Sequence, residues 1–323
     1  MRSKALVELL NSVKIQSKYP DEIIIIDGST NLETKIVLEN QFIKNANYFL
    51  VSDENRGLTK QRNFGINKVS QNSNIVCFLD DDTILNFDYF EKLISTYINF
   101  PNALGVGGYI INEVNWKKAT LDYKLKITDY FYDGWIRKEG SRFIIRKILG
   151  LDSNLPPCFL PKFSHGRSVS FLPPTNKIYE VEQFMGGVSS FNKKVFNTIK
   201  FSTFFEGYGL YEDADFTLRL SKIGKLYVNT NAKLSHYHDD SGRPNYFKYG
   251  KMVIRNGWYV WRVKYPNPKF KDRLKWNLIA LILTIIRFTN VITTPKKKQA
   301  FNETLGRILG WISLLFNKPK VIN

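Results

Sequence analysis

Short apolar runs alternate with helical patterns over the first third of the chain, and most positions within each run are apolar. A strand with one solvated face alternates apolar and polar residues, whereas a strand covered by helices on both faces does not. We predict strands at residues 22–27, 48–51, 74–79 and 104–111. We predict helices at residues 4–17, 32–44, 57–69 and 87–100. This order indicates an α/β fold with a mostly parallel central sheet flanked by helices.

The regular pattern is lost between residues 115 and 180, a stretch that is aromatic, basic and contains several prolines. It returns with a predicted strand at 186–191 and a predicted helix at 212–223. Beyond residue 241 the chain is basic, increasingly apolar and predicted to be helical. These changes divide the chain into three parts, at 1–114, 115–240 and 241–323.

Three adjacent carboxylates, Asp80-Asp81-Asp82, follow directly after the apolar run 74–79. Adjacent carboxylates repel one another unless a cation or water relieves the repulsion. Hard oxygen ligands suit Mg²⁺ or Mn²⁺ that bridges a diphosphate. The alternative is a solvated acidic turn that stabilises the start of the next helix. Ligands of such sheets lie beyond the carboxyl ends of the strands, so the position favours a metal site, with Asp27 at the end of another strand.

Other charged residues permit two interpretations each. Glu212 and Asp213 begin a predicted helix, where a carboxylate serves either as a general base or as a helix cap. His236 and His238 point to one face if they lie on a strand, and one imidazole could complete a metal site. Arg62 follows a strand and either contacts phosphate or lies on a solvated helix face.

The formal net charge of +18 predicts an anionic partner, such as a phosphate-bearing substrate or an acidic membrane surface. The apolar stretches 276–292 and 301–316 flank Lys296-Lys297-Lys298 and are predicted to form helices at the surface of an anionic leaflet. The alternative is packing on the domain or at an oligomer interface. Cys77 lies inside an apolar run and is predicted to be a buried thiol. No cleavable signal peptide is visible, so we expect a cytoplasmic protein on the inner face of the membrane.

Seven segments resemble, in order, the motifs of family 2 glycosyltransferases, which have the nucleotide-sugar-binding fold called GT-A. They lie at 6–31, 55–66, 78–83, 186–196, 211–224, 232–238 and 255–266. The third contains the sequence FLDDDT, which resembles the family's DxD motif, and the fifth begins YEDADF, which resembles its ED helix. The last resembles bacterial rhamnosyl- and galactofuranosyl-type members.

The resemblance implies a role for each candidate residue. Asp213 would be the catalytic base. Asp80, Asp82 and His236 would bind Mn²⁺ or Mg²⁺, with His238 as the alternative histidine. The residues implied at the donor are Asp27, Arg62, Asn63, Asp80 and Asp81. The residues implied on the acceptor side are Gly186, Gly187 and Glu212.

The resemblance also implies an activity and its partners. The chain would be an inverting enzyme that moves a sugar from a nucleotide-diphosphate sugar to a saccharide or polyprenyl-diphosphate-linked acceptor in cell-surface polysaccharide synthesis. Residues 1–114 would bind the donor, 115–240 the acceptor, and 241–323 the membrane. The family's first strand is expected to be missing, because Met1 leads directly into a helical pattern.

Three other functions fit parts of this sequence. The missing strand makes a degenerate, inactive protein with a binding or scaffold role the alternative. A nucleic-acid-binding protein is disfavoured, because the carboxylates would repel phosphates without metal. A nucleotidyltransferase would need a glycine-rich phosphate loop near the first strand, which this sequence lacks.

Overall fold

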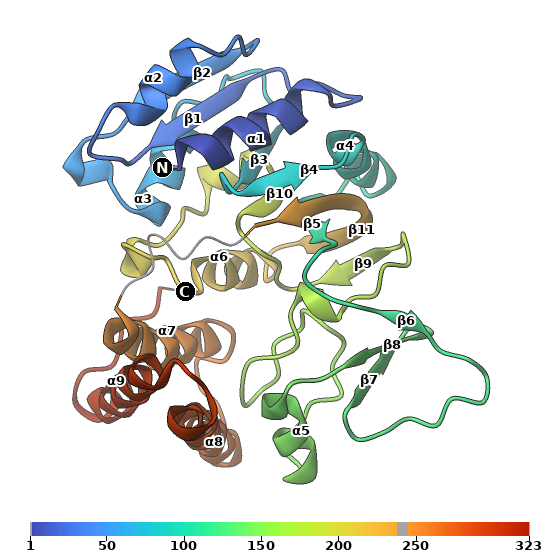
Figure 1. Ribbon diagram of the computed structural model, residues 1–323, viewed down its shortest axis with the longest axis vertical. Coiled ribbons are helices and arrows are strands. Elements are labelled where there is room, and N and C mark those ends of the chain that lie inside the picture. The colour runs from blue at the N-terminus through green and yellow to red at the C-terminus, as the bar shows by residue number, and fades with distance from the viewer. Residues whose placement is uncertain (1, 238–244, 323) are drawn as a thin grey trace. The chain divides into compact units, whose positions relative to one another are not determined.

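The four strands predicted in the first third of the chain are all present in the computed structural model, which describes residues 2–237 and 245–322 (Figure 1). The helices predicted between them are present too, although each is shorter than its pattern. The elements of this part are α1 (Ser3–Lys14), β1 (Ile23–Asp27), α2 (Glu33–Glu39), β2 (Ala46–Leu50), α3 (Leu58–Ile66), β3 (Ile75–Leu79), β4 (Thr83–Leu85), α4 (Tyr89–Asn99) and β5 (Ala103–Ile110).

The remaining elements include several that the sequence pattern did not predict. They are β6 (Lys117–Lys118), β7 (Asp129–Tyr132), β8 (Trp135–Lys138), α5 (Ser141–Ile148), β9 (Ile178–Val181), β10 (Val188–Asn192), α6 (Glu212–Leu220), β11 (Lys225–His236), α7 (Tyr246–Lys264), α8 (Phe270–Thr293) and α9 (Lys297–Phe316). Short 3-10 helices are η1 (Asp53–Asn55), η2 (Val169–Phe171), η3 (Lys193–Asn197) and η4 (Thr203–Phe205).

These elements form two compact units. The first unit consists of residues 1–113 and 174–240, and the second of residues 114–173 and 241–323. These units differ from the predicted division at 1–114, 115–240 and 241–323, because residues 114–173 group with the C-terminal helices rather than with 174–240. The division of the chain by function stays a prediction.

The large sheet of the first unit is mixed rather than mostly parallel. Its strand order is β3-β10-β5-β11-β4, and β9 also pairs with β11. Strands β5 and β11 pair in parallel, whereas β10 is antiparallel to both β3 and β5, and β11 is antiparallel to β4 and β9. The predicted strands β3 and β5 do share one direction, but β10 comes from later in the chain and lies between them.

Strands β1 and β2 form a separate two-stranded parallel sheet. Among the described residues, β1 has no strand partner on the edge away from β2, and β3 has none on the edge away from β10. The prediction that Cys77 is a buried thiol is wrong, because Cys77 lies on the edge strand β3 and is exposed.

Two apolar clusters cover the large sheet. One contains buried residues of α1 and α4, including Leu6, Leu10 and Leu93, together with inward-facing residues of β5 and β11. The apolar residues of α1 recur at helical spacing, so one side of the helix is buried. The other cluster is aromatic, and rings of Phe191 and Phe216 lie 4.9 Å apart in it. Both faces of the sheet are therefore covered, as the apolar strands predicted.

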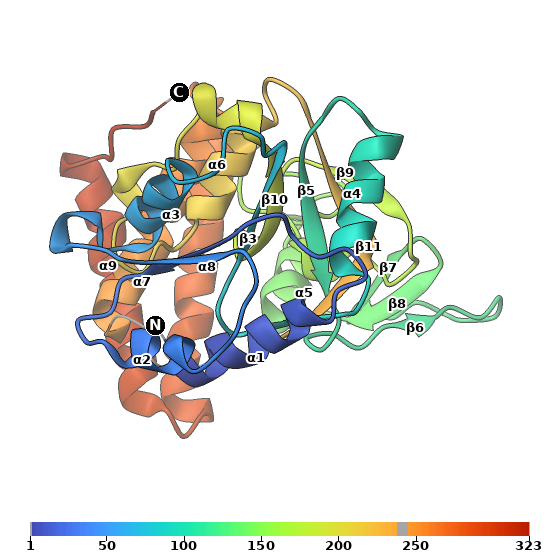
Figure 2. The same cartoon turned by 90° about the horizontal axis from the view of Figure 1, so that it is seen from above.

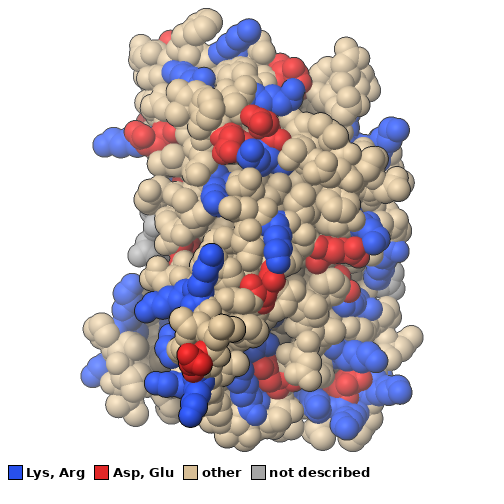
Figure 3. Space-filling view, turned by 90° about the vertical axis from the view of Figure 1, so that its right-hand side faces the viewer, with Lys and Arg blue, Asp and Glu red and all other residues tan. Residues whose placement is uncertain are grey.

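The second unit contains a small antiparallel sheet and three long helices. Its sheet has the order β6-β8-β7, and Asp133-Gly134 joins β7 to β8 with positive φ at both positions, as a type I′ turn requires. Helices α7, α8 and α9 lie side by side (Figure 2). Lysine and arginine side chains are interspersed with acidic ones over the face in Figure 3, so the positive charge is not gathered there into one band.

Helix α8 is long and apolar enough to cross a membrane, and within the described chain it alone meets that criterion. Only 22% of its most apolar window is buried. The helix begins at Phe270, before the apolar run 276–292, and this adds to its length. Length and composition alone do not distinguish a spanning helix from one that lies on a surface.

Two glycines bring α7 and α9 into backbone contact. A Cβ atom on Gly250 would lie 2.0 Å from the carbonyl oxygen of Glu303, and one on Gly306 would lie 2.0 Å from that of Phe247. Backbone atoms at these positions cannot move aside as a flexible side chain can. The crossing of α7 and α9 therefore requires glycine at both positions.

Replacing Gly306 with alanine is expected to destabilise the protein by about 1–3 kcal/mol, because the helices must separate. In an unconstrained helix the same change would stabilise by roughly 1 kcal/mol. The urea midpoint, followed by far-ultraviolet circular dichroism, measures the effect. Gly310→Ala is the matched control, with a smaller effect expected because its Cβ would meet backbone only at 3.0 Å. A raised midpoint for Gly306→Ala would contradict the packing.

Candidate active site

Two aspartates and a histidine meet at the carboxyl ends of β3 and β11 in the large sheet. Asp80 and Asp82 follow β3, and His236 ends β11. The pairing of β4 with β11 places His236 opposite Thr83, the residue directly after Asp82. One ligand atom from each of Asp80, Asp82 and His236 lies within 4.8 Å of the others. The predicted alternative, His238, lies outside the described residues.

This cluster has the donor set and the geometry for a divalent cation. Oδ1 of Asp82 is buried and accepts no hydrogen bond from the described residues, and its contact is an ion pair with Nε2 of His236 at 3.1 Å. A buried carboxylate oxygen that accepts no hydrogen bond is costly unless a cation, here the imidazolium or a metal ion, satisfies it. Two carboxylates and one imidazole suit Mn²⁺ or Mg²⁺, so Asp80, Asp82 and His236 are the residues that would hold the ion.

Glu113 contacts the His236 ring at its second nitrogen, Nδ1. Its Oε1 lies 3.3 Å from Nδ1 of His236. The carboxylates of Asp82 and Glu113 beside the ring raise the pKa of His236 to about 9. A carboxylate in this position fixes the orientation of a metal-binding imidazole. Sequence reasoning missed Glu113. It follows the carboxyl end of β5, just as Asp80 and Asp82 follow the carboxyl end of β3.

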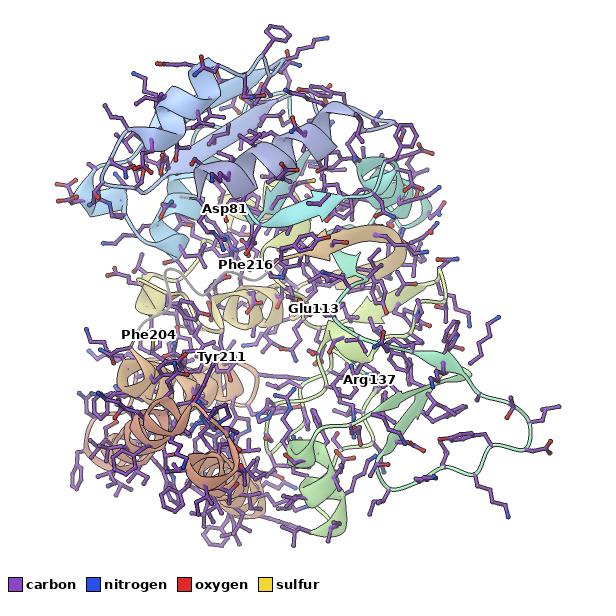
Figure 4. All side chains as sticks on the ribbon, viewed as in Figure 1. Asp81, Glu113, Arg137, Phe204, Tyr211 and Phe216 are labelled. Carbon is purple, nitrogen blue, oxygen red and sulfur yellow. The ribbon has the colours of Figure 1, made fainter. Side chains whose placement is uncertain are left out.

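Arg2 neutralises the second and third aspartates of the triplet. Its backbone N–H donates to Oδ2 of Asp81 at 3.1 Å, and its Nη1 lies 2.9 Å from Oδ2 of Asp82. Figure 4 shows Asp81 below the start of α1. Burial alone would raise the pKa of Asp82, but His236 and Arg2 outweigh burial and hold that pKa below its usual value. No sequence signal pointed to Arg2, because the contact joins residues 79 positions apart.

Asp80 lacks such a close cation. Loss of hydration raises its pKa, and the neighbouring Asp82 and Asp81 charges raise it further, although Arg62 opposes the rise. Nη2 of Arg62 lies 3.7 Å from Oδ1 of Asp80. A cation beside Asp80 would therefore relieve repulsion that the protein relieves only in part.

The Gly186-Gly187 turn joins this cluster to a second group of carboxylates. A Cβ atom on Gly187 would lie 2.0 Å from Oδ2 of Asp80, and one on Gly186 would lie 2.7 Å from Oε1 of Glu212. The backbone N–H of Gly186 donates to Oδ2 of Asp213 at 3.3 Å. The structure thus brings Asp80, Glu212 and Asp213 around one turn, and only glycine leaves room for them.

Glu212 is paired with Arg62 in the interior. Nη1 of Arg62 donates to Oε1 of Glu212, and both side chains are less than a tenth exposed. The guanidinium lies over the rings of Phe78 and Phe201, 5.8 and 5.2 Å from their centroids. Burial raises the pKa of Glu212 in spite of the arginine. Oε2 of Glu212 is buried and has no hydrogen-bond partner among the described residues.

Asp213 lies in the first turn of α6 and forms no salt bridge with the residues that the structure describes. The backbone N–H of Ala214 donates to its Oδ1 at 2.7 Å. Burial raises the pKa of Asp213, whereas these backbone hydrogen bonds and Arg62 lower it. Tyr211, just before the helix, has a φ of 70°, a left-handed conformation that is uncommon outside glycine and that sets the direction of the helix.

Two predicted donor residues lie elsewhere in the first unit. Asp27 is completely buried and accepts hydrogen bonds from the backbone N–H of Ser29 and the hydroxyl of Tyr48. Burial opposes its ionisation, but these hydrogen bonds outweigh burial and lower the pKa of Asp27. Asn63 exchanges two hydrogen bonds with the backbone of Phe201, so its amide holds that loop. Donor contacts by Asp27 and Asn63 stay predictions.

Replacing Gly187 with alanine is expected to weaken Mn²⁺ binding by about tenfold or more, because the new Cβ would displace the Asp80 carboxylate. Isothermal titration calorimetry with Mn²⁺ measures the change. Gly140→Ala is the control, since a Cβ there meets nothing within 4 Å. Equal affinity of the two variants would show that Asp80 does not take part.

Two family descriptions match the chain. Glycosyl transferase family 2 matches residues 1–184, more than half of the chain, and the N-terminal domain of galactosyltransferase matches residues 166–239. Among solved structures, GalNAc-T7 with UDP, GalNAc and Mn²⁺ has a TM-score of 0.50 and 14% identity, over 98% of this chain and 56% of that one. TarS of S. aureus has a TM-score of 0.48 and 15% identity, over 97% of this chain and 46% of that one.

Two curated proteins are similar over shorter stretches. The glucosyl-dolichyl phosphate glucuronosyltransferase of Haloferax volcanii is 32% identical over 112 residues, 34% of each chain. The glycosyltransferase GlyA of Streptococcus pneumoniae serotype 4 is 31% identical over 105 residues, 32% of this chain and 15% of that one. The chain thus spans about a third or less of these relatives. The match to more than half of its residues shows that the chain is a glycosyltransferase of family 2, with the GT-A fold.

Proposed function

We propose that this glycosyltransferase moves a sugar from a nucleotide-diphosphate sugar to a saccharide or lipid-linked acceptor, with inversion at the anomeric carbon. The observation that carries the proposal is the Gly186-Gly187 turn, which holds Asp213 on one side and the Asp80–Asp82–His236 cluster on the other. A base and an ion-binding cluster at one turn are what a metal-assisted displacement of a diphosphate requires.

Mn²⁺ or Mg²⁺ would be held by Asp80, Asp82 and His236. A bound ion supplies charge that stabilises the departing nucleoside diphosphate. Glu113 would keep the His236 ring in place, and Arg62 would add a fixed positive charge near the phosphates. The Mn²⁺ in the GalNAc-T7 structure, which shares the fold, supports the use of a divalent ion.

Asp213 would accept the proton of the acceptor hydroxyl at a carboxylate oxygen while that hydroxyl attacks the anomeric carbon. Glu212 is less suited to this role, because Arg62 occupies one of its oxygens. The raised pKa of Asp213 makes it a stronger base than an exposed aspartate. One base and one displacement give inversion, because no covalent sugar intermediate forms. Gly186, Gly187 and Glu212 would border the acceptor, and Asp27, Arg62, Asn63 and Asp81 the donor.

A lipid-linked acceptor would bring the enzyme to a membrane, and the exposed apolar surface of α8 supports this placement. The Haloferax volcanii relative is named for glucosyl-dolichyl phosphate, which is a lipid-linked sugar. We therefore place the enzyme in cell-surface polysaccharide synthesis, on the cytoplasmic face of the membrane, with α8 and α9 at the anionic leaflet. A rhamnosyl or galactofuranosyl specificity remains part of this proposal.

Replacing Asp213 with asparagine is expected to lower turnover by roughly 10²–10⁴, because the variant lacks the base. Donor binding should stay within about twofold. A panel of UDP-, GDP- and dTDP-sugars, tested for Mn²⁺-dependent hydrolysis, first identifies the donor, and proton NMR of the product then gives its anomeric configuration.

Asp21→Asn is the control, since Asp21 is exposed and belongs to the same unit. Full turnover by Asp213→Asn would refute the base assignment. Failure of the unmodified chain to bind any nucleotide sugar by calorimetry would instead favour an inactive binding or scaffold protein.

The affinity for Mn²⁺ is expected to rise with pH by up to about tenfold per unit below pH 9, because the His236 imidazolium must lose its proton before it binds metal. Calorimetry between about pH 6 and 8, in buffers of different ionisation enthalpy, should show close to one proton released per ion. His236→Gln should bind Mn²⁺ more weakly and with a smaller pH slope. An affinity independent of pH would exclude His236 as a ligand.

A further inference from the structure

Helices α7, α8 and α9 of the second unit line an open pocket of about 200 Å³. Four of the six tryptophans in the chain line it: Trp258, Trp261, Trp276 and Trp311. The rings of Trp261 and Trp276 stack 5.5 Å apart and are almost fully buried, whereas Trp258 and Trp311 are partly buried. A closed helical core fills the space between its aromatic rings. This aromatic core therefore has an opening of ligand size.

The charged residues of the pocket lining are all cations. They are Arg262 of α7, Arg273 of α8 and Lys318, which follows α9. No carboxylate lines the pocket, and none of the three cations forms a salt bridge with a described residue. Burial and the charge of Arg273 lower the pKa of Arg262. Cations gathered without a counterion favour an anion in the pocket.

Arg262 shows where such an anion would bind. Its Nη2 donates to the carbonyl oxygen of Pro266, and its guanidinium lies 5.2 Å from the centroid of the Trp258 ring. Its Nε is buried and finds no hydrogen-bond partner within residues 2–237 and 245–322. Buried arginine donors are normally satisfied, and a phosphate oxygen accepts from them strongly. The aromatic ring therefore holds a guanidinium that retains an unused donor.

An exposed apolar stripe on α8 begins beside the pocket. It consists of Leu274, Leu278, Leu281, Ile285, Phe288 and Ile292. Residues with this spacing lie along one face of a helix. Arg273 and Asn277, which line the pocket, are neighbours in sequence of its first two members. The surface next to the cations thus offers a path for a long apolar chain.

We propose that this pocket binds the phosphate head of a membrane lipid, with Arg262, Arg273 and Lys318 around the phosphate and the α8 stripe against the lipid chains. A soluble anion would use the cations but would leave the stripe exposed to water. Diffuse attraction to an acidic membrane would use charge anywhere on the surface and would not need a buried donor among tryptophans. The site goes beyond the membrane placement proposed above, because it specifies one headgroup position.

The test is sedimentation of the full chain with vesicles of phosphatidylcholine containing either phosphatidic acid or phosphatidylserine, adjusted to equal surface charge. Phosphatidic acid presents a phosphate monoester, so it should bind more tightly. Arg262→Gln should weaken binding to the phosphatidic acid vesicles by about tenfold or more, through the loss of charged hydrogen bonds. Arg142→Gln removes the same charge from the same unit at an exposed position outside the pocket, and it should change binding less than twofold.

A second pair of variants separates the contribution of the lipid phosphate from that of the lipid acyl chains. Lys318→Gln lies at an exposed position after α9, so its effect is independent of helix packing, and it should weaken binding in the same direction. Ile285→Gln should weaken vesicle binding but leave unchanged the response of tryptophan fluorescence to inorganic phosphate. Circular dichroism checks the fold of each variant.

Equal binding of the two vesicle types, or equal losses for Arg262→Gln and Arg142→Gln, would overturn the pocket as a headgroup site. Tight binding of inorganic phosphate with no effect of Ile285→Gln on vesicles would overturn the lipid and leave a soluble anion. No nucleotide sugar is present in these measurements. A negative result in the vesicle measurements therefore does not contradict the proposed transferase activity. A negative result in the activity measurements likewise does not contradict the headgroup site.

Discussion

Six carboxylates lie close together at the carboxyl ends of the strands of the large sheet, and their mutual repulsion must be offset by neighbouring cations. The group consists of Asp80, Asp81, Asp82, Glu113, Glu212 and Asp213. Arg2, Arg62 and His236 compensate it, and each comes from a different part of the chain. Like charges this close are costly without such partners. The site therefore becomes stable only once α1, α3 and β11 are in place.

The sequence predicted the elements of the first third of the chain, because their apolar periodicity is strong and their connections are short. It did not predict how the strands pair. Strand β10 shows the reason, since nothing in residues 188–192 says that they lie between β3 and β5 rather than at an edge. The predicted burial of Cys77 was also wrong, because an apolar run has the same sequence pattern in a central strand and in an edge strand.

Within the site, the residues that follow strands or begin helices could be predicted. Asp80, Asp82 and His236 do meet, as their order in the chain implied. Arg2 and Glu113 could not be found in the same way, because their roles depend on contacts across 79 and 123 residues. The steric role of Gly187 was equally hidden, since it depends on where the Asp80 side chain lies. Sequence pattern thus identified the candidate ligands, whose binding of metal stays a prediction, but not the groups that contact them.

The division of the sheet has a practical consequence for anyone who handles the protein. Among the described residues β1 and β3 each lack a strand partner on one side, and the sequences IIIID and IVCFL contain neither lysine nor proline. Natural proteins use such residues to keep strand edges from joining those of other molecules. Loss of material during storage should therefore depend steeply on protein concentration and proceed by strand-to-strand aggregation, even in buffers where the folded state itself is fully stable.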